Sequence, residues 1–219
     1  MLRSTIAAVS VVVLGLAVFT GVAMGKKPGK KPGRTASCLG MTATIVGTQG
    51  PDVINGTAGA DVIAARAGRD EIAGLGGDDV ICGGQGRDTI QGGDGTDKLA
   101  GQQGNDLMDG GVLGCCGPGN TGDDELFGGQ GRDVLHASDF GNNTLHGGQG
   151  ADELHGWQGN DTLEGGNGRD VLESFIGNDT LRGGNGRDRL DGGAGTDTLD
   201  GGRGFDSCAG GESNTRCES

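Results

Sequence analysis

The chain has 219 residues, of which 52 are glycine, and its formal net charge at pH 7 is -13. Tyrosine is absent and aromatic residues make up 3% of the sequence, which excludes a conventional globular domain with a large mixed core. The acidic balance disfavours nucleic acids and anionic membranes as partners and favours cations.

The first 25 residues have the features of an export signal peptide. Arg3 supplies the positive start, residues 6–22 are apolar, small or hydroxyl-bearing, and residues 23–25 fit a small-x-small cleavage pattern. An uncleaved anchor helix is the alternative, because an apolar stretch of about 17 residues lies at the short edge of a membrane span. In either case residues 1–25 are excluded from the fold.

A basic linker follows at residues 26–37. Its KKPGKKPGR run combines five basic residues with Pro and Gly, which prevent a helix or a strand. We expect a solubilising tether here, with electrostatic attachment to an anionic cell envelope as the alternative. Residues 38–46 are expected to form an N-terminal cap.

Nine-residue repeats begin at Gly47 and continue to Ala209. In eighteen successive units, position four is Gly in 17, position six is Asp in 16, and position eight is Ile, Leu or Met in 16. One unit, residues 110–118, is degenerate, and the unit at residues 137–146 has ten residues. Regular glycine spacing of this kind indicates a solenoid rather than disorder.

Each unit divides into turn chemistry and a short strand. Positions one to six are rich in glycine, which takes backbone angles closed to other residues. Positions seven to nine are expected to form a strand with one inward aliphatic side chain. Two units make a full coil, so unit n is expected to stack on unit n+2 in a parallel sheet.

The pattern resembles the RTX nonapeptide repeat, G-G-x-G-x-D-x-U-x, which forms calcium-binding parallel β-rolls. GGQGRD at residues 83–88 and GGNGRD at residues 183–188 match the first six positions in full. The resemblance covers residues 47–209 and implies an all-β fold, a right-handed parallel β-roll solenoid of about eighteen nonapeptide half-coils. One aliphatic side chain per unit is a thin core, so we expect the metal-free chain not to fold.

The resemblance also implies that the position-six aspartates and the turn carbonyls bind several Ca²⁺ ions. These are hard oxygen ligands, which calcium accepts in loose geometry, whereas zinc would require Cys or His. The expected ligands are Asp52, Asp61, Asp70, Asp79, Asp88, Asp97, Asp106, Asp124, Asp133, Asp152, Asp161, Asp170, Asp179, Asp188, Asp197 and Asp206.

Some units depart from the pattern. Leu113 and Cys115 replace the turn glycine and the ligand, so a site should be missing there, and Asn143 should make its site weaker. Three turns are expected to be strained because a side chain replaces the second glycine: Leu75, Trp157 and Phe175.

Six cysteines in an exported chain suggest disulfides. We pair Cys208 with Cys217, nine residues further on, as a staple in a C-terminal cap at residues 210–219. By elimination Cys38 pairs with Cys82, although the N-terminal cap must then fold back across two coils. The adjacent Cys115 and Cys116 are left open between a vicinal disulfide, free thiols and a bridge to another chain.

Three histidines fall at position nine, which is expected to face solvent. His136 and His155 should lie on one sheet and could form a weak transition-metal pair. Ordinary surface residues are the favoured interpretation. They are His136, His146 and His155.

The sequence predicts a secreted, non-catalytic calcium-binding protein that is extracellular or attached to the cell surface. It contains no H-E-x-x-H or G-x-S-x-G motif, and we expect no nucleic acid and no small-molecule substrate. The alternatives are a surface adhesin and an accessory module of an RTX-type hydrolase, and a cell-envelope or extracellular partner is left open. An ice-binding solenoid is disfavoured, because position nine lacks a regular array of threonine.

Overall fold

The computed structural model describes residues 36–111, 122–138, 140–211 and 213–217. The expected signal peptide and most of the basic linker lie outside this range, as do Cys115 and Cys116. In the described part of the chain, no helix is long and apolar enough to cross a membrane.

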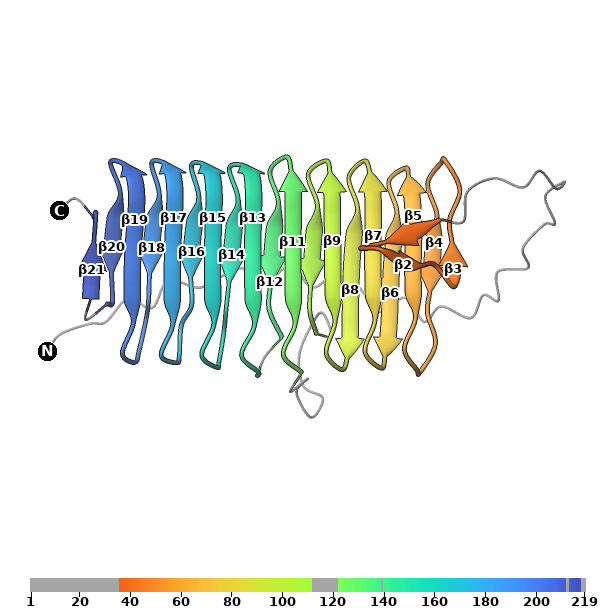
Figure 1. Ribbon diagram of the computed structural model, residues 1–219, viewed down its shortest axis with the longest axis horizontal. Helices are drawn as coiled ribbons and strands as arrows, with labels where there is room; N and C mark the ends of the chain where they lie inside the picture. Colours follow the sequence, from red (N-terminus) through yellow and green to blue (C-terminus); the bar gives the residue numbers. More distant parts are fainter. Residues whose placement is uncertain (1–35, 112–121, 139, 212, 218–219) are drawn as a thin grey trace, which may run out of the picture. The chain divides into compact units, whose positions relative to one another are not determined.

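Two parallel sheets face each other along the whole roll (Figure 1). Successive strands alternate between the sheets, so each sheet contains every second strand of the chain. The 10-stranded sheet contains β3 (Ile45–Val46), β5 (Val62–Ala67), β7 (Val80–Gln85), β9 (Lys98–Gln103), β11 (Glu125–Gln130), β13 (Thr144–Gly150), β15 (Thr162–Gly168), β17 (Thr180–Gly186), β19 (Thr198–Gly204) and β21 (Ser213–Thr215). The 9-stranded sheet contains β4 (Val53–Asn55), β6 (Glu71–Gly76), β8 (Thr89–Asp94), β10 (Leu107–Asp109), β12 (Val134–His136), β14 (Glu153–His155), β16 (Val171–Glu173), β18 (Arg189–Asp191) and β20 (Ser207–Ala209).

The expected stacking of unit n on unit n+2 is confirmed. Leu163 pairs with Leu145 on one side and with Leu181 on the other, all at position eight. These side chains are fully buried between the sheets, so the core is one aliphatic residue wide per half-coil. Strands of the 10-stranded sheet are longer than the three residues expected, because most continue into position three of the next unit.

The expected half-coil at residues 110–118 does not belong to the stack. β11 pairs with β9, and β12 pairs with β10. These pairings leave no strand of the stack for the nine extra residues. A Cβ built on Gly110 would lie 2.4 Å from Oδ2 of Asp124, and one on Gly83 would lie 2.4 Å from Oδ2 of Asp88. Gly110 is therefore position one of the Asp124 unit. By sequence register, residues 112–120 are nine residues more than one unit needs, and without them the unit would begin GGTGDD.

A small hairpin closes the N-terminal end. β1 (Ser37–Cys38) and β2 (Met41–Thr42) are antiparallel, and β1 contacts β5 and β7. The expected disulfide between Cys38 and Cys82 is present, with a Cα–Cα distance of 5.5 Å. Cys38 is fully buried against Ala64 and Ala100, so the hairpin covers the outer face of the first coils.

The C-terminal end is closed by β21, which pairs with β19. The expected disulfide between Cys208 and Cys217 is present and joins β20 to this cap, with a Cα–Cα distance of 5.7 Å. Arg216 forms an ion pair with Asp200 on the last long strand. One disulfide therefore fastens the hairpin to the outer face of the first coils, and the other fastens the C-terminal cap to β20.

Candidate metal sites in two aspartate ladders

The position-six residues form two ladders, one along each edge of the roll, and each of these residues is called a rung. The Oδ1 atom of each rung accepts a hydrogen bond from the backbone N–H of the rung before it, as Asp170 accepts from Asp152 at 2.9 Å. One ladder contains Asp52, Asp70, Asp88, Asp106, Asp133, Asp152, Asp170, Asp188 and Asp206. The other contains Asp61, Asp79, Asp97, Asp124, Asn143, Asp161, Asp179 and Asp197. The fold thus brings all sixteen predicted residues into two continuous rows.

Most of these carboxylates are buried with one oxygen unsatisfied. The side chains are at most 8% exposed, except for that of Asp52, which is half-buried. Twelve Oδ2 atoms have no hydrogen-bond partner: those of Asp70, Asp79, Asp88, Asp97, Asp106, Asp133, Asp152, Asp161, Asp170, Asp179, Asp188 and Asp206. Burying an anionic oxygen without a partner is costly, so the ladders have the chemistry of an incomplete cation site.

Burial raises the pKa of the ladder carboxyls from Asp70 to Asp188. Loss of water is the largest cause, and the backbone N–H donor only partly offsets it. Repulsion between carboxylates of neighbouring rungs raises the pKa further. The pKa rises from 3.8 to about 7 for Asp97, Asp106, Asp124, Asp161 and Asp170, and to about 6 for Asp133. At neutral pH the ladders therefore require a positive charge or a proton.

The first glycine of each turn leaves a small space lined by oxygen atoms. A Cβ built on Gly165 would lie 2.7 Å from Oδ2 of Asp170 and 2.7 Å from the carbonyl oxygen of Gly183 in the next coil. Oxygens of two stacked coils thus face the same space. Calcium binds such mixed sets of carboxylate and carbonyl oxygens, so the residues present fit this metal.

Serine hydroxyls occupy the equivalent spaces in two units. Ser174 stands at position one and donates a hydrogen bond to the carbonyl of Gly192 at 2.9 Å. Ser138 is within 3.3 Å of the carbonyls of Gly122 and Phe140 and of Oδ1 of Asn143. These contacts were not predicted from the sequence, and they show that the spaces attract a hydrogen-bonding group.

The first two units differ from the rest. Thr48 bonds Oδ2 of Asp52 through its backbone N–H at 2.6 Å and its hydroxyl at 3.0 Å. Thr57 bonds Oδ2 of Asp61 in the same way, at 2.7 and 2.9 Å. These two aspartates therefore cap their own turns. The threonine at position two of both units is the sequence feature that indicates this capping.

Leu113 and Cys115, where a site was expected to be missing, lie outside the described residues, and the ladder has no gap beside them. The ladder continues directly from Asp97 to Asp124, with a distance of 2.8 Å between the donor nitrogen and Oδ1. On the other edge, the backbone N–H of Asp106 donates a hydrogen bond to Oδ1 of Asp133 at 2.8 Å. The described rungs on either side of the degenerate unit are therefore neighbours in each ladder.

The three expected strained turns do have left-handed backbones. Leu75, Trp157 and Phe175 have φ values of 83°, 69° and 68°, in a region that favours glycine. The rings of Trp157 and Phe175 stack with a centroid distance of 4.8 Å, so contact between neighbouring coils offsets part of the strain. Arg66 and Gln102 adopt the same conformation at position two and were overlooked in the sequence.

The histidines are less exposed than expected. His136 and His155 lie on neighbouring strands with ring centroids 5.0 Å apart, and the side chain of His155 is 14% exposed. In the described chain, no group of three or more His, Cys, Asp or Glu side chains is placed to hold a metal ion. A transition-metal site at the histidines is therefore unsupported, and any calcium site would need main-chain carbonyls beside the aspartates.

The stacked half-coils and the buried carboxylate rows define a parallel β-roll with acidic turns. A family model described as the RTX calcium-binding nonapeptide repeat, in four copies, matches residues 46–81, 83–112, 118–139, 138–172 and 174–208. The chain belongs to this family, and membership implies that it binds Ca²⁺. A search of the curated proteins finds no match.

Proposed function

We propose that the chain is an exported, non-catalytic calcium-binding protein whose roll folds when the ladders bind Ca²⁺. The observation that carries the proposal is the set of twelve buried carboxylate oxygens without a hydrogen-bond partner. Calcium bound there would neutralise the rows and join stacked coils through shared oxygens. Because metal that binds only the folded state stabilises it, folding and binding would be coupled.

We assign the role of ligand to the sixteen ladder aspartates, with two expected to be weak. Oδ2 of Asp52 and Oδ2 of Asp61 already accept two hydrogen bonds each from their own turns. Asn143 keeps an oxygen in the row but contributes no charge. The strongest sites are therefore proposed between Asp70 and Asp206, where the carboxylates are most completely buried.

Export is supported by the two disulfides, which persist in oxidising compartments. We propose residues 1–25 as the signal peptide or anchor and residues 26–37 as the linker. The roll would then fold outside the cell, where calcium is abundant. The alternative functions, a surface adhesin or an accessory module of an RTX-type hydrolase, would place a partner on the same calcium-dependent roll.

Calorimetric titration of the mature protein with Ca²⁺ tests the proposal, with Mg²⁺ as the control ion. We expect several calcium ions to bind cooperatively and magnesium to compete poorly, because magnesium demands a tighter octahedron and keeps its waters. Absence of calcium binding, or equal binding of both ions, would contradict it.

A further inference from the structure

The turns that follow the strands of the 10-stranded sheet, at the upper edge in Figure 1, carry five arginines in one stacked column, which Asn105 and Ala151 interrupt. They occupy position five and are Arg69, Arg87, Arg132, Arg169 and Arg187. The stacking of these positions is direct: the backbone N–H of Arg132 donates to Oδ1 of Asn105, one coil away, at 2.8 Å. At about 4.8 Å per coil, the row extends over roughly 29 Å from Arg69 to Arg187.

The nine-residue insertion decides this alignment. If residues 110–118 formed a half-coil, Arg69 and Arg87 would lie on one edge and the three later arginines on the other. Because the stack steps over the insertion, β9 pairs with β11 and all five arginines meet on one edge. The described position-three and position-five residues of the opposite edge include no basic residue and three acids, Asp78, Asp94 and Asp123.

A row of amides runs beside the arginines, at position three of the same turns. Paired residues in neighbouring strands form this row: Gln85, Gln103, Gln130, Gln149, Asn167 and Asn185. All six are exposed. Positions three and five of these nine turns contain no acidic residue, although the chain has 30 acids. We name these two columns the amide–arginine strip.

The guanidinium groups of the strip are free to bind. All five arginines are exposed, and none has an ion-pair partner in the described part of the chain. Basic residues elsewhere behave differently: Arg182 pairs with Glu164, and Lys98 pairs with Glu125. In a protein of net charge -13, five exposed and unpaired arginines on one edge make that edge the surface best suited to an anionic partner.

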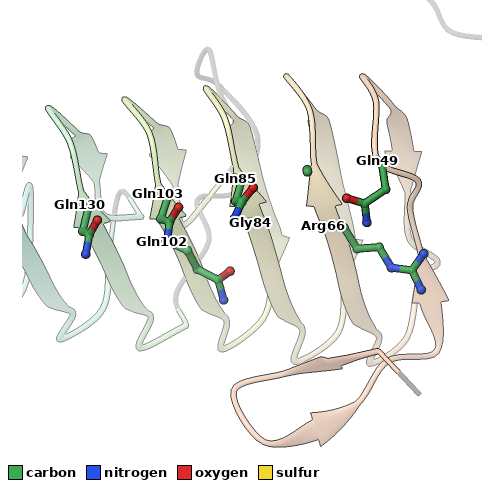
Figure 2. Close-up of a pocket in the computed structure, with 8 residues that line it drawn as sticks. Gln49, Arg66, Gly84, Gln85, Gln102, Gln103 and Gln130 are labelled. Carbon is green, nitrogen blue, oxygen red and sulfur yellow. The ribbon is translucent and has the colours of Figure 1, made fainter. Parts of the chain in front are cut away.

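The surface of the strip is grooved at both ends. One groove of about 540 Å³ is lined by Gln49, Arg66, Gln85, Gln103 and Gln130, whose side chains project from neighbouring coils in Figure 2. A second groove of about 640 Å³ is lined by Arg169, Arg187, Arg189 and Phe205 together with three buried ladder aspartates, Asp170, Asp188 and Asp206. The first groove is lined by residues at positions two and three of the turns and the second by residues at positions five to seven, so each groove borders one column of the strip.

We propose that the amide–arginine strip binds a linear anionic polysaccharide that carries carboxylate groups. Guanidinium groups bind carboxylates in a bidentate manner, and side-chain amides both donate to and accept from sugar hydroxyls. Five of the seven consecutive coils from Arg69 to Arg187 present an arginine, so a linear polymer with repeated carboxylates would meet several of them along the roll. Single-stranded nucleic acid would require aromatic stacking surfaces, which the strip lacks apart from Phe205, and a membrane surface would require an apolar face.

Binding of polygalacturonate to the calcium-loaded, full-length mature protein tests the proposal. Arg169→Gln/Arg187→Gln removes two strip charges, and Lys98→Gln/Arg182→Gln removes two charges elsewhere. At low salt we expect the first variant to lose at least tenfold in affinity and the second to stay within twofold of the parent. Circular dichroism of each calcium-loaded variant verifies that the roll is folded, which separates this test from that of calcium binding.

Several results would overturn the proposal. They are absence of polygalacturonate binding by the folded parent protein, equal losses in the two variants, and equal or tighter binding of duplex DNA or polyphosphate. Polysaccharide binding that survives 1 M salt would also contradict it, because pairing of exposed charges is screened at that ionic strength.

Discussion

Replacing a central rung should destabilise the calcium-loaded roll more than replacing a terminal one. Oδ1 of Asp170 accepts from the N–H of Asp152, and Oδ1 of Asp206 accepts from the N–H of Asp188, each at 2.9 Å. Alanine at either position leaves one buried N–H without an acceptor, which costs about 1–3 kcal/mol. This contribution is common to both variants and cancels when they are compared.

The difference comes from the neighbours of each rung. Asp170 has rungs on both sides, so on our account its carboxylate serves two calcium sites, whereas Asp206 is the last rung and serves one. If the extra metal contact is at least as strong as a charged hydrogen bond, Asp170→Ala should lose about 1.5–3 kcal/mol more than Asp206→Ala. A solenoid depends on contacts between neighbouring units, so a central break also lowers cooperativity.

Urea unfolding at saturating calcium measures this difference. Asp170→Asn is the control, because it keeps the Oδ1 acceptor and should recover the hydrogen-bond contribution of about 1–3 kcal/mol relative to Asp170→Ala. Equal losses of unfolding free energy in Asp170→Ala and Asp206→Ala would refute the sharing of aspartates between coils.

The remaining predictions concern pH, the insertion, the ladder gap and a disulfide. The pKa of Asp97 and Asp170 rises from 3.8 to about 7 in the fold, so metal-free stability should be highest below pH 4 and fall as the pH rises to 7. Circular dichroism in chelator checks this, and a metal-free β signal that grows with pH would contradict it. Deleting residues 112–120 should leave the calcium titration unchanged, because the ladder already bridges Asp97 and Asp124; a higher midpoint would show that the insertion supports the stack. Asn143→Asp should lower the calcium midpoint by restoring a charged rung, and an unchanged midpoint would exclude a metal site there. Cys38→Ser/Cys82→Ser should lower unfolding free energy in calcium by about 4 kcal/mol, since the disulfide closes a long loop. Thermal unfolding measures that loss, and an unchanged melting temperature would count against it.

The stacking of the repeats and the positions of the ladder residues could be predicted from the sequence. Glycine at position four, Asp at position six and an aliphatic residue at position eight repeat in register, and this determines which side chains turn inward. Cys208 and Cys217 could also be paired, because the second lies close beyond the last unit.

The insertion could not be recognised, because its length equals that of one repeat. Nine extra residues leave the sequence register unchanged, so only the pairing of β9 with β11 shows that they are outside the stack. The same shift determines which edge each later turn occupies, so the alignment of Arg87 with Arg132 was hidden as well. The hydroxyls of Ser138 and Ser174 were missed because their contacts cross between coils.

The central claim is that calcium holds together a roll that its own core cannot. The most direct test is far-UV circular dichroism of the mature protein in excess chelator at pH 7.4, followed by addition of Ca²⁺. We predict a disordered spectrum in chelator and a cooperative change to a β spectrum with calcium. A β spectrum that persists in chelator at this pH would show that the ladders fold without metal and would contradict the claim.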